Sequence, residues 1–175
     1  MRCANIVLIV AAVSLLGACG TDNSAYEAAL REALGQADIT LIGAVSVAEA
    51  ETPEAHAVRA ALLVGEAPVF SVRTEAAGAL RILDVDITTG AILTATDAGA
   101  AGESCGQAIA LNDALAIAEE RVGGEAVAVV WDDDVSCARE IQVLTDPELM
   151  EVKVASDGRV LETEESDEDG GIDDD

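Results

Sequence analysis

Apolar and polar residues follow the same order twice along this chain. Residues 39–93 run as an alanine-rich helical stretch, a breaker and three segments with strand-like alternation, and residues 109–161 repeat that order roughly seventy positions later. Leu41–Glu49 and Leu111–Glu119 open the two copies with leucine, alanine and glutamate in step. Each copy closes with a glycine-containing turn and two aliphatic residues. A pattern repeated over this length indicates a duplicated structural unit.

Alternation of apolar and polar residues predicts three strands after the helix of each copy. The predicted strands lie near residues 58–64, 70–73 and 80–87 in the first copy and near 127–131, 137–143 and 150–154 in the second. Such alternation is typical of a sheet with one buried face, and the short polar spacers suit antiparallel hairpins. The sequence therefore predicts an α+β fold of two tandem units, each with one helix packed on a three-stranded antiparallel sheet.

The N-terminus has the pattern of a bacterial export signal. Residues 6–16 form an apolar run that is too short for a membrane-spanning helix. Leu16-Gly17-Ala18-Cys19 then has the form of a lipobox, which predicts cleavage before Cys19 and attachment of acyl chains, palmitate among them, to that cysteine. The alternative is an ordinary cleaved signal with an incidental cysteine. Lipidation would anchor the protein to a membrane outside the cytoplasm, and Gly20 favours the outer membrane slightly over the inner one.

These patterns divide the whole chain into six predicted segments. They are a lipoprotein signal peptide (1–18), a tether with a short helix (19–38), the first repeat (39–97), a linker (98–108), the second repeat (109–164) and an acidic disordered tail (165–175). Each repeat alone has a small core and would be marginally stable.

The chain is strongly acidic and poor in aromatic residues. It carries 34 acidic and nine basic residues, for a formal net charge of −25, and its aromatic residues are Tyr26, Phe70 and Trp131. Nucleic-acid binding depends on clustered lysine and arginine, so the charge excludes nucleic acid as a partner and disfavours contact with anionic lipid. It favours basic or cationic partners.

Cys105 and Cys137 are the cysteines that remain after processing and lipidation at Cys19. Proteins outside the cytoplasm are usually in an oxidising environment, so we expect a disulfide between them. The alternative is a pair of buried free thiols. A redox site is less favoured because the chain has no Cys-x-x-Cys motif.

The sequence predicts no catalytic residues and no enzyme activity. His56 is the sole histidine, and it lies where the first strand should begin, a common place for an exposed or half-buried histidine. Glu119 and Glu120 are adjacent in the second helix, so they point about 100° apart and would not face one substrate. No zinc-protease, serine-hydrolase or phosphate-loop motif occurs.

The acidic segments predict no specific metal site and no cofactor. Residues 165–172 share part of an EF-hand loop, but the closing bidentate glutamate is missing. Asp132–Asp134 is expected to be a solvated hairpin tip. Weak attraction of divalent cations to these residues remains an open alternative.

The helix, the antiparallel strands and the closing turn together resemble the PepSY domain. Val85–Leu93 is most similar to the closing signature of that family, and Ser156–Leu161 is its counterpart in the second copy. PepSY domains occur in propeptides of secreted thermolysin-like peptidases and in bacterial exported or lipid-anchored proteins. The resemblance implies a non-catalytic module that inhibits or modulates peptidases outside the cytoplasm, and it brings no catalytic residues.

Together these features predict a lipid-anchored binding module outside the cytoplasm. Its membrane contact would be the lipid on Cys19, and its partner would be a peptidase or another envelope protein, contacted through an exposed strand edge. The alternative function is an acidic surface lipoprotein that buffers divalent cations. The sequence leaves open the identity of the partner and whether the two repeats pack together.

Overall fold

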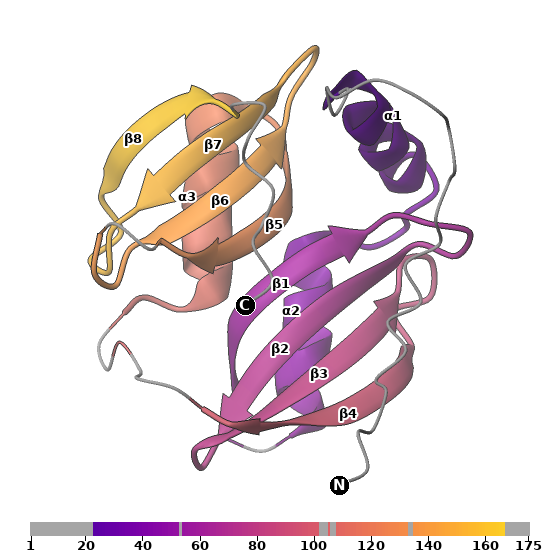
Figure 1. The fold of residues 1–175 in the computed structure, drawn as a ribbon, viewed down its shortest axis with the longest axis vertical. Helices are drawn as coiled ribbons and strands as arrows, with labels where there is room; N and C mark the ends of the chain where they lie inside the picture. Colours follow the sequence, from indigo (N-terminus) through magenta and orange to yellow (C-terminus); the bar gives the residue numbers. More distant parts are fainter. Residues whose placement is uncertain (1–22, 53, 102–104, 106–107, 133–134, 167–175) are drawn as a thin grey trace, which may run out of the picture.

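A computed structural model describes residues 23–52, 54–101, 105, 108–132 and 135–166. Within these residues the chain forms three helices and eight strands. In order they are α1 (Asn23–Leu34), α2 (Leu41–Glu51), β1 (His56–Leu63), β2 (Val69–Ala76), β3 (Ala79–Asp86), β4 (Ile92–Ala100), α3 (Leu111–Val122), β5 (Glu125–Trp131), β6 (Arg139–Leu144), β7 (Leu149–Val154) and β8 (Val160–Glu165). We call α2 with β1–β4 the first half and α3 with β5–β8 the second half (Figure 1).

All eight strands belong to one antiparallel sheet, with the order β4-β3-β2-β1-β5-β6-β7-β8. The predicted fold of two separate units, each with a helix on a three-stranded sheet, is therefore wrong. The first strands of the two copies pair with each other through Ala60 with Val129 and Ala61 with Ala128. Each of these strands would otherwise present an open edge of unpaired backbone groups, and their pairing removes both edges from solvent.

Each half also has a fourth strand that the hydrophobic pattern did not reveal. β4 begins at Ile92 and β8 at Val160, which are the aliphatic residues after the predicted glycine turns. All residues of β4 after Ile92 are exposed, and β8 is mostly exposed. An edge strand with little buried surface shows no alternation of apolar and polar residues. The pattern that predicts a strand is therefore absent from β4 and β8.

The two repeat helices lie side by side on one face of the sheet. Both helices appear behind the sheet in Figure 1, α2 over the first half and α3 over the second. Each buries four residues at helical spacing, namely Leu41, Ala44, Val45 and Ala48 in α2 and Leu111, Ala114, Leu115 and Ala118 in α3. The Asn112 side-chain amide donates to the Ser46 hydroxyl at 3.0 Å, which joins the helices directly.

The glutamates that are in step between the two copies have the same structural role. The Glu49 carboxylate accepts a hydrogen bond from the backbone N–H of Ala57 at 2.8 Å, and the Glu119 carboxylate accepts one from Ala126 at 3.0 Å. Each bond joins the last turn of a helix to the start of the strand that follows. The sequence repeat thus corresponds to a repeat of hydrogen bonding.

Helix α1 contacts both halves at one end of the sheet. Its Leu30 and Ala33 are buried in the core. The Arg31 guanidinium donates to the carbonyl of Thr145 at 2.7 Å and to that of Pro147, in the loop between β6 and β7. On its other side α1 lies against the turn between β1 and β2, with Ala33 and Val64 lining a shared hollow. α1 therefore adds a second connection between the halves.

Because the two halves share one core, we expect a core substitution in one half to destabilise the other half as well. Phe70→Ala removes the largest fully buried side chain of the chain and should lower the free energy of unfolding by about 3–5 kcal/mol. Trp131, the single tryptophan, lies in the second half and reports on it by fluorescence. We expect its urea transition to shift together with the far-ultraviolet circular dichroism.

Ile141→Ala in the second half is the matched control, because Ile141 is also fully buried. It should move the same two signals in the same direction. A Trp131 transition that keeps its wild-type midpoint in Phe70→Ala would mean that the halves unfold independently.

Candidate binding cleft between the two halves

The candidate site is a cleft where the two central strands separate. β1 and β5 pair only at residues 60–61 and 128–129 among the described residues, so the start of β1 and the end of β5 lie apart. The space between them measures about 620 Å³. Its lining comes from both halves and includes Val58, Arg73, Leu80, Trp131 and Arg139, together with the start of α3.

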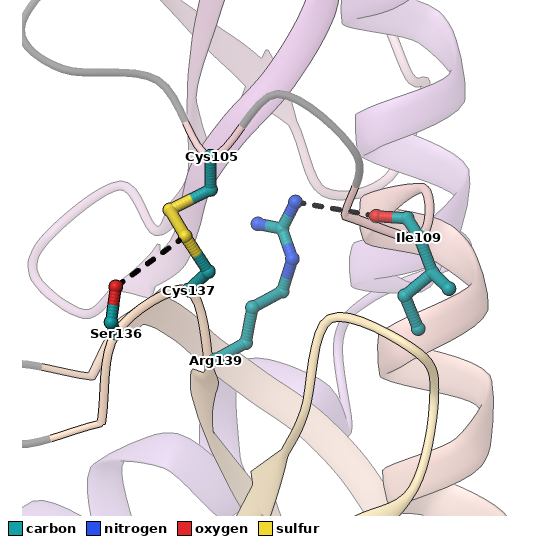
Figure 2. The surroundings of a disulfide bond; sticks show 5 residues. All are labelled: Cys105, Ile109, Ser136, Cys137 and Arg139. Carbon is teal, nitrogen blue, oxygen red and sulfur yellow. Dashed lines mark hydrogen bonds between the residues drawn. A yellow bond between two sulfur atoms is a disulfide. The ribbon is translucent and has the colours of Figure 1, made fainter.

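Arg139 is the central charged residue of this cleft. Its side chain is almost fully enclosed, with the residue 5% exposed, and its guanidinium carbon lies 4.0 Å from the centroid of the Trp131 ring. Nη2 donates to the carbonyl of Ile109 at 3.5 Å, the long end of the hydrogen-bond range (Figure 2). Nε and Nη1 have no hydrogen-bond partner among the described residues. Burial lowers the pKa of Arg139 to about 10, and the negative charge of Glu49 opposes that shift, so the side chain stays cationic at neutral pH.

The strand registers show what Arg139 replaces. In the first half Phe70 pairs with Leu62 on one side and Val85 on the other. In the second half Arg139 pairs with Trp131 and Val154, and all three residues lie 69 positions after their counterparts. Arg139 therefore occupies the place that Phe70, a fully buried core residue, has in the first copy.

Other charged groups at the cleft balance one another. Arg73 lines it as a second cation, and Glu49 and Glu75 line it as carboxylates. His56 stands at the rim with 61% of its side chain exposed, and its Nε2 lies 3.9 Å from the Glu75 carboxylate. The exposed position of His56 agrees with the expectation from the sequence. This balance suits a ligand with a single charge better than one with several.

The predicted disulfide is present beside this cleft. Cys105 and Cys137 are bonded, with their Cα atoms 5.4 Å apart, and Cys105 contributes to the lining. Figure 2 shows the Arg139 side chain between the disulfide and the backbone of Ile109. The cross-link thus joins the segment before α3 to the residues just before β6.

The cleft was not predicted from the sequence, although one signal for it was present. Arg139 shares its strand face with the apolar residues Ile141 and Val143, and both of these are fully buried. A cation in step with core positions is costly unless it is paired or functional. That mismatch could have identified Arg139, but the position of the cleft depends on the pairing of β1 with β5.

The remaining predicted site residues lie elsewhere or outside the described part. Cys19 and the signal peptide lie outside it, as do residues 167–175 of the acidic tail. Glu119 binds the backbone of Ala126, while Glu120 is exposed. Among the described residues no cluster of histidine, cysteine, aspartate or glutamate could hold a metal ion. None of the described helices is long and apolar enough to cross a membrane.

The open face of the second half carries a compact group of charges around Lys153. Glu140 and Lys153 alternate with the core residues Ile141 and Val152, so they lie on the face opposite the helices. The Lys153 ammonium lies 3.4 Å from Asp132 and 3.8 Å from both Glu151 and Glu162. The expectation of a solvated hairpin tip is wrong for Asp132, whose side chain is fully buried against this lysine. Asp133 and Asp134 lie outside the described residues.

Comparisons with known proteins show a structural similarity to one solved lipoprotein structure. No family model matches the chain, and no curated protein is significantly similar to it. The crystal structure of a candidate lipoprotein from Clostridium difficile 630 aligns over 74% of this chain and 95% of that one. The two share 17% sequence identity, with a TM-score of 0.45.

Glu151 predicts a distinct pH dependence of stability. Burial first, and then the neighbouring Glu140, raises its pKa from 4.5 to about 7, although Lys153 opposes this shift. A raised pKa in the folded state gives stability that is full at low pH and is lost as the pH rises from about 4.5 through 7. Glu151→Gln cannot ionise, so its stability relative to the wild type should increase between pH 5 and pH 8. Urea unfolding at both pH values measures the difference.

Glu120→Gln is the control for that experiment, because Glu120 is an exposed glutamate on α3. Its stability relative to the wild type should change little over the same range. An equal stability difference for Glu151→Gln at pH 5 and pH 8 would show that Glu151 titrates normally.

Removal of the disulfide should lower stability substantially. The bond joins residues separated by 32 positions, and loop-closure entropy for such a loop corresponds to about 3 to 4 kcal/mol. We expect the Cys105→Ser/Cys137→Ser double variant to lose that amount in urea unfolding monitored by Trp131. A loss below about 1 kcal/mol would show that the loop is already ordered without the bond.

Proposed function

We propose that this protein is a non-catalytic, lipid-anchored binding module of the cell envelope that modulates or inhibits a peptidase or another envelope protein. The observation that carries the proposal is the free outer edge of β4. Among the described residues, β4 is the terminal strand of the sheet and has no neighbour beyond it. An extended segment of a partner can add to such an edge through backbone hydrogen bonds.

The two edges of the sheet differ in how well they are protected against pairing. β4 has nine residues, mostly small and with Asp97 as its single charge. β8 has six residues and carries three glutamates, Glu162, Glu164 and Glu165. Charged and short edge strands resist pairing, whereas long edges with few charges allow it. The contrast favours β4 as the docking edge.

The resemblance to PepSY domains supports the same assignment. The signature-like stretch Val85–Leu93 contains the turn from β3 into β4. In that turn the Asp86 carboxylate accepts hydrogen bonds from the backbone N–H groups and hydroxyls of both Thr88 and Thr89. These bonds hold the carboxylate in its charged form and lower its pKa to about 2. The motif therefore builds the hairpin that presents β4, and it supplies no catalytic group.

The location outside the cytoplasm is supported by two sequence features that fit together. The lipobox ending at Cys19 would provide the anchor, and the Cys105–Cys137 disulfide suits an oxidising compartment. An anchored module would act on proteins in the same envelope layer, and its net charge of −25 would attract basic segments.

Leu93→Lys tests the docking edge. Leu93 is 55% exposed on β4, so a lysine should leave the fold intact while blunting the edge. When the tagged lipoprotein is purified from detergent-solubilised envelopes, we expect recovery of its protein partner to fall roughly tenfold or more, equivalent to about 1.4 kcal/mol or more of binding free energy. Quantitative mass spectrometry of the co-purified proteins measures the change.

Leu161→Lys is the matched control, because Leu161 follows the equivalent turn, lies on the opposite edge strand and is 43% exposed. It should retain the partner. Equal recovery in both variants would rule out β4 as the docking edge, and failure to recover any partner, with unchanged envelope proteolysis on deletion, would refute the proposed function.

A further inference from the structure

We propose that the cleft between β1 and β5 binds a carboxylate carried on an apolar group, held by Arg139 and the first turn of α3. This site is separate from the β4 edge and does not depend on the function proposed for that edge. Four features of the described residues carry the inference.

The first feature is an unpaired cation at a core position. In the first half this position holds Phe70, which is fully buried, and in the second half it holds Arg139. Burying a cation is costly unless it is closely paired. Nε and Nη1 of Arg139 have no hydrogen-bond partner among the described residues, and Glu49 acts on the guanidinium as a nearby negative charge. Residues that break the local packing rule at a cavity are typical of binding sites.

The second feature is an uncapped helix end at the same place. In the first half Thr40 caps α2 by accepting a hydrogen bond from the backbone N–H of Gly43. Its counterpart 70 positions later is Ala110, which has no side-chain acceptor, so α3 has no side-chain cap. Ala108, Ile109, Ala110 and Leu111 line the cleft. The first N–H groups of a helix and its dipole attract anions.

The third feature is that both changes between the copies act in the same direction. One replaces an apolar ring by a cation, and the other removes the oxygen that would occupy the helix amides. Either alone could be neutral divergence between repeats. Together they place a cation and a helix end without a side-chain cap at one cavity, although Asp113 lies in the same first turn. The disulfide joins Cys105, before α3, to Cys137, before β6.

The fourth feature is the lining, which selects the kind of anion. Val58, Leu80 and Trp131 give apolar walls, and a space of about 620 Å³ suits a small organic molecule. Glu49 and Glu75 balance the charges of Arg73 and Arg139, and this balance disfavours multiply charged phosphate. A guanidinium binds carboxylate through two parallel hydrogen bonds. Nη2 of Arg139 makes a long contact with the carbonyl of Ile109, and Nε and Nη1 make no hydrogen bond among the described residues, so the guanidinium has donors available for a carboxylate.

Two sources could supply this ligand chemistry, namely the free C-terminus of a peptide and a fatty acid. The probes are acetyl-alanyl-leucine with a free carboxylate, the same peptide as its amide, octanoate and inorganic phosphate, each titrated into the full-length protein. Trp131 lies against Arg139 and is the single tryptophan, so its fluorescence reports on the site directly. We expect a saturable change with at least one of the two apolar carboxylates and none with the amide.

The variants separate binding from folding. Arg139→Phe restores the residue type of the first half and should abolish binding while raising the urea midpoint, because it removes a buried unpaired cation. Arg139→Gln should weaken binding roughly ten- to hundredfold. Ala110→Thr gives α3 the kind of cap that Thr40 gives α2, and it should weaken binding while it stabilises the fold. A purely structural role for these positions would not make binding and stability change in opposite directions.

The charge balance gives a matched pair of further variants. Glu49→Gln keeps the acceptor for the Ala57 amide but removes a carboxylate from the cleft, so the carboxylate probe should bind several-fold more tightly. Glu119→Gln makes the same change at the equivalent glutamate, which does not line the cleft, and should have no effect.

Saturation with the peptide, with octanoate or with both supports the proposal and identifies the source of the carboxylate. Equal binding of the acid and the amide, unchanged binding in Arg139→Phe, or phosphate binding as tight as that of the carboxylates would overturn it. The absence of a saturable response to every probe would do the same.

Discussion

The pairing of β1 with β5 determines the architecture of this protein. It turns two copies of a small unit into one eight-stranded sheet, and it brings α2 and α3 together on one face over a common core. A unit of this size buries too little apolar surface to be stable alone. The junction is made from small residues, with Ala60, Ala61 and Ala128 among the four that pair. Because the pairing is confined to that short stretch, the strands separate beyond it and leave a cleft lined from both halves.

Because the unit is duplicated, each position in one half can be compared with its equivalent in the other half. Residues with the same role in both copies, such as Glu49 and Glu119, show what the fold requires, since each carboxylate accepts a hydrogen bond from one backbone amide near the start of the following strand. Positions that differ show what the fold does not require. Phe70 and Thr40 complete the core and the helix cap of the first half, whereas Arg139 and Ala110 do neither in the second. Both differences lie at the cleft, so function offers a better explanation of them than random divergence.

The helices and strands with a strong apolar periodicity could be predicted from the sequence, and those without it could not. The helix at the start of each copy and the pairing of Cys105 with Cys137 were predicted correctly, because helical spacing and the number of cysteines can be read directly from the sequence. β4 and β8 were missed because exposed edge strands bury almost no side chains. The joining of the halves was missed because pairing between strands about seventy residues apart leaves no local pattern. Arg139 lies on the same strand face as buried residues, and this could be read from the sequence. Its environment could not be inferred without the pairing of β1 with β5.

The disulfide links stability to the proposed binding site. Cys105 precedes α3 and Cys137 precedes β6, so the bond fixes the approach to the uncapped helix end and the strand that begins at Arg139. These are the two parts of the cleft that would hold a carboxylate, and the residues between them include all of α3 and β5. Without the bond the fold could persist through its core, yet the guanidinium and the helix amides would lose their common constraint. A site that depends on the geometry of two elements needs such a constraint more than the core does.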